Sequence, residues 1–495
     1  MNVYPRRPLF NRRPQSNIYR MFLWVILILV FIWMLQQMNK GEIKPLFLPS
    51  PTPTRAADSY ALEGDANFTA GNLDEAILAY KEALRVDPNN AGIWAKLARI
   101  QTYSTAFIIT NPDKKARLLE ALESARKAVE LAPDDSTAHA ILAFTLDWNA
   151  DSSIYSDDLE QVQKFLVEAE QEAVRAQQLD NTNTLALAYY AEVLLDQQKW
   201  SQAEQYINLA LQRPDSDQMD VHRVNAYLLE TLGQYNLAIT EYDKAIALEP
   251  NFTFLYLRAG ANYRRLASEI PNEDSARPVY ERSLEYFEKA VRINEQIKVK
   301  DPTPYLFIAR TYSQLGEFFA AALNIQGALE FDPTNPDIYG QLGVVYFRSR
   351  NYEGSIYSLQ CATYGCSGED SCLGRGLEKC NPDLGPEYTE ATIPPSEVSP
   401  STIVYYYTYG SVLAALSRPA DNKCGLAMRV LGDVRNELAI NPDAYTDGYQ
   451  TILSIVQAGE EICQSLAEDA VPASAAPEDG GSSMGGELVT VTLEP

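Results

Sequence analysis

A pattern of about 34 residues recurs along most of this chain, and it limits the possible folds more than any other feature of the sequence. Residues 219–252 show it clearly, because small and apolar side chains recur at helical spacing on both sides of Gly233, and Pro250 stops the second half. Residues 302–335 and 57–90 place small residues, aromatics and a closing proline at the same offsets. Each copy predicts a hairpin of two helices, so the fold class is expected to be all-α.

The period and the placing of these residues resemble the tetratricopeptide repeat (TPR) family. In residues 219–252 the resemblance is carried by Ala226, Gly233, Tyr242 and Ala245, together with the closing proline. It implies a right-handed α-α superhelical solenoid of about 8–9 hairpins that acts as a binding scaffold.

The repeat register also predicts how the chain is divided. The period is interrupted by insertions near 104–114, after Trp148 and near 267–279, and it fails after Ala362. We expect these segments: 1–20, a basic cytoplasmic segment; 21–39, a transmembrane helix; 40–56, a proline-rich extended linker; 57–362, the TPR solenoid; 363–401, a cysteine-rich insertion; 402–467, a ninth hairpin and capping helix; and 468–495, an acidic disordered tail.

The transmembrane prediction rests on 19 uncharged residues between Arg20 and Lys40. At 1.5 Å per residue they reach about 28 Å, close to the thickness of a bilayer core. Basic residues are more frequent before this stretch than after it, which places the N-terminus in the cytoplasm and the repeats outside it, in a single-pass protein of the cell membrane. A cleaved signal peptide is the alternative, but no small-x-small cleavage site precedes Lys40.

The formal net charge of −25 argues against nucleic acid as a partner, because binding phosphate requires a positive surface. Solubility is the simplest reason for such a charge, and an acidic docking face is the alternative. Nothing in the sequence indicates a small-molecule substrate.

The six cysteines all lie in the last third of the chain, at Cys361, Cys366, Cys372, Cys380, Cys424 and Cys463. An even number outside the cytoplasm favours disulfides. Cys424 and Cys463 lie on successive antiparallel helices and could meet, which would leave the other four to pair among themselves. A structural zinc site or a redox-active pair is less favoured, because the spacings contain no C-x-x-C and no histidine lies near.

No arrangement of residues points to catalysis. The two histidines, His139 and His222, take a position that packs against the neighbouring hairpin in the TPR family, and neither a nucleotide-binding loop nor a catalytic triad can be proposed. We therefore expect a protein that is not an enzyme and that has no cofactor and no metal.

The resemblance also implies a binding groove, because positions 2, 5, 9, 12 and 13 of each TPR line the concave face in that family. Here these positions fall on Phe68, Arg99, Tyr103, Phe144, Trp148, Arg223, Tyr227, Arg264, Arg265, Arg310, Phe347 and Arg348. Arginine forks and aromatic faces suit a peptide with carboxylates and apolar side chains. The alternative is that these residues pair with local carboxylates or pack against the next helix. The carboxylate-clamp pattern of some family members is absent, since Arg223 and Tyr227 replace its Lys and Asn.

Together these features predict a membrane-anchored, extracytoplasmic TPR scaffold that binds proteins or peptides, acidic ones included, and organises an envelope complex. One alternative is a chaperone-like assembly factor for translocated proteins. Another is a redox or metal module in the cysteine-rich insertion, and a third is structural self-association, which like charges oppose.

Overall fold

The computed structural model describes residues 17–39, 55–108, 110–152, 154–155, 158–385, 388–446 and 448–469. The chain divides into two units, Met1–Ala56 and Ala57–Pro495, and each is described by itself. Residues 1–16 of the predicted basic segment, residues 40–54 of the predicted linker and residues 470–495 of the predicted tail lie outside the described residues.

The first unit contains one helix, α1 (Ile18–Asn39), which spans the segment predicted to cross a membrane. From Ile18 to Met34 its large apolar side chains are exposed. Within the described part of the chain, however, no helix has both the length and the apolar character needed to cross a membrane. The predicted transmembrane helix therefore has no support from this finding.

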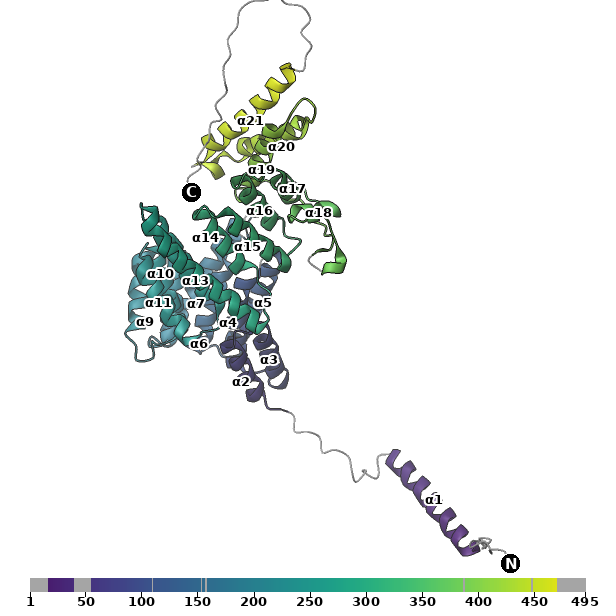
Figure 1. The fold of residues 1–495 in the computed structure, drawn as a ribbon. Helices are drawn as coiled ribbons and strands as arrows, with labels where there is room; N and C mark the ends of the chain where they lie inside the picture. Colours follow the sequence, from purple (N-terminus) through teal and green to yellow (C-terminus); the bar gives the residue numbers. More distant parts are fainter. Residues whose placement is uncertain are drawn as a thin grey trace, which may run out of the picture. The chain divides into compact units, whose positions relative to one another are not determined.

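The second unit is built of consecutive helical hairpins, which confirms the predicted all-helical fold (Figure 1). Strand pairing among the described residues is limited to two isolated bridges. The hairpins are α2 (Ala57–Thr69) with α3 (Leu73–Val86), α4 (Ala91–Ser104) with α5 (Asn111–Leu131), α6 (Ser136–Asn149) with α7 (Leu159–Leu179), α8 (Thr184–Asp196) with α9 (Trp200–Leu211), α10 (Met219–Thr231) with α11 (Tyr235–Leu248), α12 (Thr253–Ser268) with α13 (Glu273–Ile297), α14 (Thr303–Gln314) with α15 (Phe318–Phe331), and α16 (Pro336–Arg348) with α17 (Tyr352–Thr363).

Glycine is required at two kinds of position in these hairpins. Gly233 lies in the turn between α10 and α11 with a φ of 72°, a conformation that side chains disfavour. Gly64 lies where two helices touch, because a Cβ there would be 2.7 Å from the ring of Tyr80. The small residues of the repeat thus allow close helix packing.

The insertions predicted from the register lengthen the second helix of a hairpin. Helices α5 and α7 each have 21 residues and α13 has 25, whereas α3 and α11 have 14. Near 104–114 the chain also forms a short 3-10 helix, Thr105–Phe107. The additional residues are therefore mostly helical and extend the hairpins.

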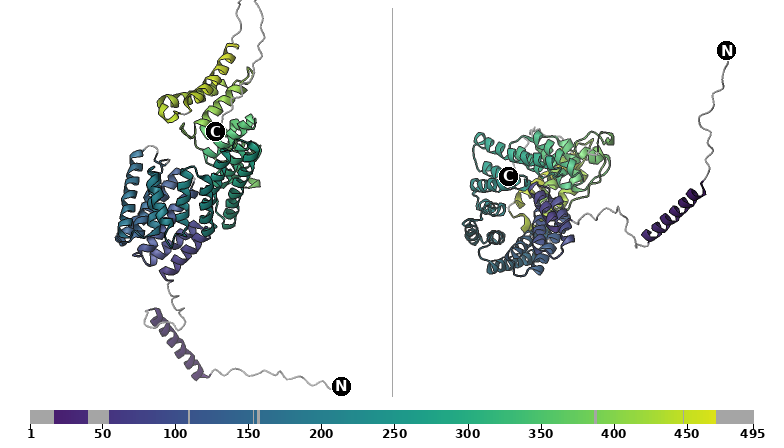
Figure 2. Two further views of the ribbon diagram at one scale, coloured as in Figure 1. Left: turned by 90° about the vertical axis from the view of Figure 1, so that its left-hand side faces the viewer. Right: turned by 90° about the horizontal axis from the view of Figure 1, so that it is seen from below.

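The solenoid turns back on itself within one superhelical turn, which no residue pattern predicted. The first hairpin meets the chain between α11 and α12, where Asn251 Nδ2 donates to the carbonyl of Thr69 at 3.0 Å. The rings of Phe68 and Phe252 lie 6.0 Å apart, and a Cβ at Gly71 would be 2.6 Å from the carbonyl oxygen of Asn251. Seen from below, the helices are arranged around a ring (Figure 2, right).

After α17 the regular pattern is replaced by a disulfide-linked segment with α18 (Glu369–Gly374) and a 3-10 helix (Pro382–Leu384). Disulfides join Cys361 to Cys366 and Cys372 to Cys380. A further pair of helices, α19 (Ile403–Leu416) and α20 (Cys424–Ile440), follows, and α21 (Tyr449–Asp469) packs on it after a 3-10 turn (Pro442–Tyr445). The third disulfide, Cys424–Cys463, ties α21 to the start of α20.

Candidate functional site

The inner helices of the first superhelical turn meet in a buried network of ion pairs. Arg99 of α4 donates to both oxygens of Asp220 of α10, at 3.2 and 2.6 Å. Arg223 of α10 donates to both oxygens of Glu192 of α8, at 2.7 and 2.6 Å. The phenol of Tyr103 accepts from Arg223 at 3.0 Å and donates to Asp220, so the two pairs form one network.

Burial and charge act in opposite directions on Asp220. Burial alone would raise the pKa of this carboxyl, but Arg99 and Arg223 outweigh it and lower the pKa to about 2. Asp220 is therefore ionised at neutral pH, and the network is charged and internally satisfied.

Aromatic rings fill the space around these ion pairs. Phe144 stacks on Tyr189 with ring centres 4.4 Å apart, and Tyr103 lies 5.1 Å from Phe144 and 5.7 Å from Trp148. The Arg99 guanidinium lies 5.0 Å from the centre of the Phe68 ring. Interactions of this kind stabilise desolvated arginines.

The predicted groove residues therefore fall into two groups. The first group lies in or beside the interior network and has internal partners: Phe68, Arg99, Tyr103, Phe144, Trp148, Arg223, Tyr227 and Arg265. Tyr227 donates to Asp196 at 2.6 Å, and Arg265 pairs with Glu230, which also receives Arg258 at 3.0 Å. For the arginines and tyrosines of this group, the alternative of pairing with local carboxylates describes the contacts seen.

The second group is Arg264, Arg310, Phe347 and Arg348, on α12, α14 and α16. Among the residues that the structure describes, none of its three arginines has a carboxylate within ion-pair distance. Arg310 and Arg348 are exposed, and so is the ring of Phe347. Burial, together with the charges of Arg310 and Arg265, lowers the pKa of Arg264 to about 10. We call these four residues the arginine surface.

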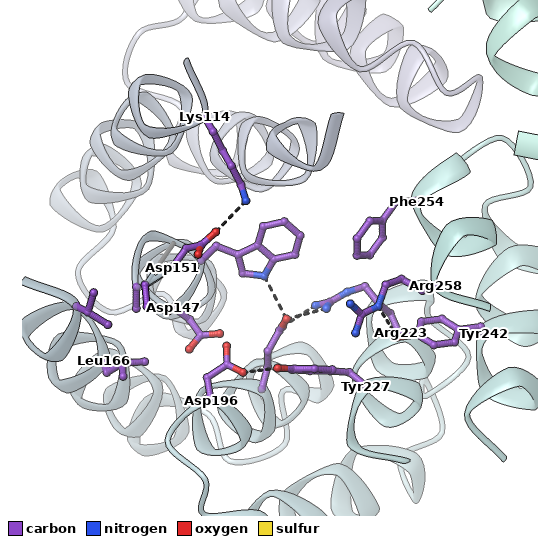
Figure 3. Close-up of a pocket in the computed structure, with 15 residues that line it drawn as sticks. Lys114, Asp147, Asp151, Leu166, Asp196, Arg223, Tyr227, Tyr242, Phe254 and Arg258 are labelled. Carbon is purple, nitrogen blue, oxygen red and sulfur yellow. Dashed lines mark hydrogen bonds and ion pairs between the residues drawn. The ribbon is translucent and has the colours of Figure 1, made fainter. Parts of the chain in front are cut away.

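A pocket of about 510 Å³ opens beside the buried network, and the sequence analysis did not single it out (Figure 3). Asp147 of α6 and Asp196 of α8 line it, as Figure 3 shows, and Glu192, Trp148 and Tyr227 are also part of its wall. Asp147 and Asp196 take the twelfth or thirteenth place of their repeats. The register that selected the arginines could therefore also have selected these acids.

The cysteines and the two histidines of the described residues make structural contacts. No free cysteine is present there, and no group of three or more His, Cys, Asp or Glu side chains could hold a metal ion. His139 and His222 are buried, and their Nδ1 atoms lie 2.5 and 2.7 Å from Glu172 and Glu241.

Comparisons with known proteins agree with the hairpin fold. Residues 64–101 match the family profile described as TPR repeat, and residues 226–252 match the one described as tetratricopeptide repeat. The chain contains tetratricopeptide repeats. TPR proteins are generally non-enzymatic scaffolds that commonly bind protein or peptide partners.

Similarity to individual proteins is low. The anaphase-promoting complex subunit 3 of Schizosaccharomyces pombe is 26% identical over 130 residues, which are 26% of this chain and 17% of that protein. A thermophilic TPR protein of Thermus thermophilus is 19% identical with a TM-score of 0.34, over 42% of this chain and 98% of that one. The human IFIT1 dimer with PPP-AAAA is 16% identical with a TM-score of 0.46, over 84% of this chain and 92% of that one.

Proposed function

We propose that this protein is a membrane-anchored, extracytoplasmic scaffold whose arginine surface binds an acidic segment of a protein partner and so helps to organise an envelope complex. The observation that carries the proposal is the contrast between the two groups of arginines. In a chain of net charge −25, carboxylates are plentiful, and the two arginines of the interior network, Arg99 and Arg223, each have one. Arg264, Arg310 and Arg348 have none among the described residues, although arginine forks suit carboxylates well.

The surroundings of these arginines suit binding at an interface. The Arg264 guanidinium lies 5.3 Å from the centre of the Phe307 ring, and its Nη1 donates to the Phe307 carbonyl at 3.5 Å, so its donors have no carboxylate partner in the described residues. The exposed ring of Phe347 offers an apolar contact beside Arg348. Arginine and aromatic residues, phenylalanine included, are enriched at protein interfaces.

The anchor and the compartment are further parts of the proposal. The exposed apolar side chains of α1 and the basic residues that precede them support an anchor. Three disulfides support an oxidising compartment outside the cytoplasm. Alkaline carbonate extraction tests the anchor: the full chain should remain with the membrane, whereas Leu27→Arg combined with Val30→Arg should release it.

Affinity capture from native membranes tests the arginine surface. The full chain and an Arg264→Glu, Arg310→Glu variant are compared in non-ionic detergent, and retained proteins are identified by mass spectrometry. Arg265 is left unchanged because its reversal would break the internal pair with Glu230. The matched control is Arg85→Glu with Arg292→Glu, since both side chains are exposed on other helices.

We expect a discrete partner that the control variant retains and the Arg264/Arg310 variant loses by at least about tenfold, which corresponds to 1.4 kcal/mol. Equal capture by both variants would remove the arginine surface from the proposal. A broad mixture of secreted proteins would instead favour the chaperone-like alternative.

A further inference from the structure

Two carboxylates in the pocket beside the buried network have no role in the proposed function. Asp147 is 3% exposed, and no donor group of another side chain or of the backbone reaches its carboxylate among the described residues; its hydrogen-bond neighbour is the other carboxylate, Asp196. Asp196 is exposed to the solvent of the pocket, and the two carboxylates face each other in Figure 3. A buried polar group without a partner destabilises the fold, so a donor supplied by a ligand would satisfy it.

The charge of the pocket wall indicates what kind of donor this is. The other charged side chains of the wall are paired, as Arg223–Glu192 at 2.6 Å, Lys114–Asp151 at 2.8 Å and Arg258–Glu230 at 3.0 Å. Asp147 and Asp196 are therefore the wall's two carboxylates without a cationic partner in the described structure. Their proximity and enclosure favour a cation.

The aromatic part of the wall suits an organic cation with an aliphatic stem. The rings of Trp148 and Phe254 lie 6.1 Å apart, and both face the pocket. The Trp148 indole is held in place by donating to Glu192 at 3.1 Å. Aromatic faces attract ammonium and guanidinium groups, and a volume of about 510 Å³ lies in the range of pockets that enclose small ligands.

We propose that this pocket binds an arginine or lysine side chain of a partner polypeptide, with the cationic group between Asp147 and Asp196 and the stem against Trp148 and Phe254. This goes beyond the proposed function, because it assigns a second site with the opposite charge preference. It does not depend on Arg264 or Arg310, so either proposal can fail alone.

The empty pocket should hold a proton that the cation displaces. Burial raises the pKa of Asp147 well above its ordinary value, and the nearby charges of Asp196 and Glu192 raise it further. Enclosure also raises the pKa of Asp196 to about 6, although the hydrogen bond from Tyr227 opposes this. Other titratable and charged groups facing the two carboxylates from the packed helices and the pocket wall are Lys114, Asp151, Glu192, Arg223, Tyr227, Tyr242 and Arg258. Binding should therefore strengthen from pH 5 to pH 8, since a cation binds better to the ionised carboxylates.

Fluorescence anisotropy of short peptides tests the site on the full chain in non-ionic detergent. The probes are acetylated, dansyl-labelled Gly-Ser-Xaa-Ser-Gly amides in which Xaa is arginine, lysine or the neutral isostere citrulline. We expect the arginine and lysine peptides to bind at least about tenfold more tightly than the citrulline peptide. Asp147→Asn and Asp196→Asn should each remove most of this preference, and the double variant all of it.

The control Asp443→Asn makes the same change at an exposed site on the 3-10 turn before α21, and it should leave the preference intact. Helicity measured by circular dichroism establishes that each variant is folded, and the citrulline comparison in the unchanged protein needs no variant.

Equal binding of the arginine and citrulline peptides would overturn the proposal. Competition by free argininamide at the same concentration as the peptide would overturn its polypeptide part and assign the pocket to a small cation. Loss of arginine-peptide binding in the Arg264→Glu, Arg310→Glu variant would overturn the separation of the two sites.

Discussion

The first superhelical turn, residues 57–268, and the C-terminal region, residues 303–469, are both built of helix pairs, but they are held together differently. In the first turn the decisive contacts join residues far apart in the chain, such as Arg99 with Asp220 and Asn251 with Thr69, at separations of 121 and 182 residues. In the C-terminal region the cross-links are disulfides at separations of 5, 8 and 39 residues.

This difference has a consequence for how each part loses its structure. A solenoid is ordinarily stabilised by contacts between neighbouring repeats alone. The first superhelical turn also has contacts between its two ends, so a substitution at its centre should destabilise the whole turn. The C-terminal region should depend on oxidation and should fail independently of the turn.

We expect the largest loss of stability when Arg223, the buried arginine at the centre of the first superhelical turn, is replaced. Replacing Arg223 by Met leaves Glu192, which is 3% exposed, as an unpaired buried charge close to Asp147. Breaking a buried pair in this way costs about 3–5 kcal/mol of the free energy of unfolding, and we expect the upper end. Chemical denaturation followed by tryptophan fluorescence measures it, because Trp94, Trp148 and Trp200 all lie in the turn.

The control for this prediction is the double variant Arg223→Met, Glu192→Met. It removes both charges and should recover most of the stability, since a buried pair replaced by apolar residues is often tolerated. A single variant within about 1 kcal/mol of the unchanged protein would mean that the interior network does not hold the turn together.

The next largest loss of stability is expected in the C-terminal region. Replacing Cys424 and Cys463 by Ser opens a loop of 39 residues, which costs about 4 kcal/mol in the chain-entropy account of disulfides. Because no tryptophan lies in the C-terminal region, helicity should show a new early transition while tryptophan fluorescence stays unchanged. The matched variant without Cys361–Cys366, with a separation of 5, should cost about 2 kcal/mol. A shift of the fluorescence transition in either variant would show that the two regions unfold together.

The hairpins themselves were predictable because their signals are local. Gly233 marks a turn that requires a positive φ, and Gly64 marks a close helix contact, so each can be recognised from its repeat alone. The meeting of Cys424 with Cys463 likewise follows from two successive helices.

The closure of the turn was not predictable from these signals. It depends on small rotations that accumulate from repeat to repeat, and no single residue pattern encodes their sum. For this reason Arg223 was expected to face a ligand, whereas its guanidinium lies against Glu192 and Tyr103 in the interior. Of the open arginines, Arg310 and Arg348 belong to repeats beyond the first superhelical turn, whereas Arg264 lies on α12, the last helix of that turn.

The smallest expected effect concerns the pH dependence of the turn's stability and tests whether the pocket carboxylates oppose the network around them. The folded-state pKa of Asp196 is raised to about 6 from an ordinary value of 3.8, so the folded state holds its proton more tightly than the unfolded state does. The stability that this provides is fully present below pH 3.8 and is lost as the pH rises through about 6.

Tryptophan-detected melting of the unchanged protein and of Asp196→Asn at pH 4.5 to 7.5 measures this pH dependence. The variant should become the more stable of the two as the pH rises, by a modest margin, because Asp196 is open to the water of the pocket. Glu241 has the opposite effect on the pH dependence of stability. Its pKa is lowered to about 2, so its contribution to stability is lost only in acid, below the pH range of this measurement. If the difference in melting temperature between the two proteins did not change across this pH range, Asp196 would not be destabilised by ionisation in the folded state. The first superhelical turn would then be stabilised by its ion pairs without an opposing charge.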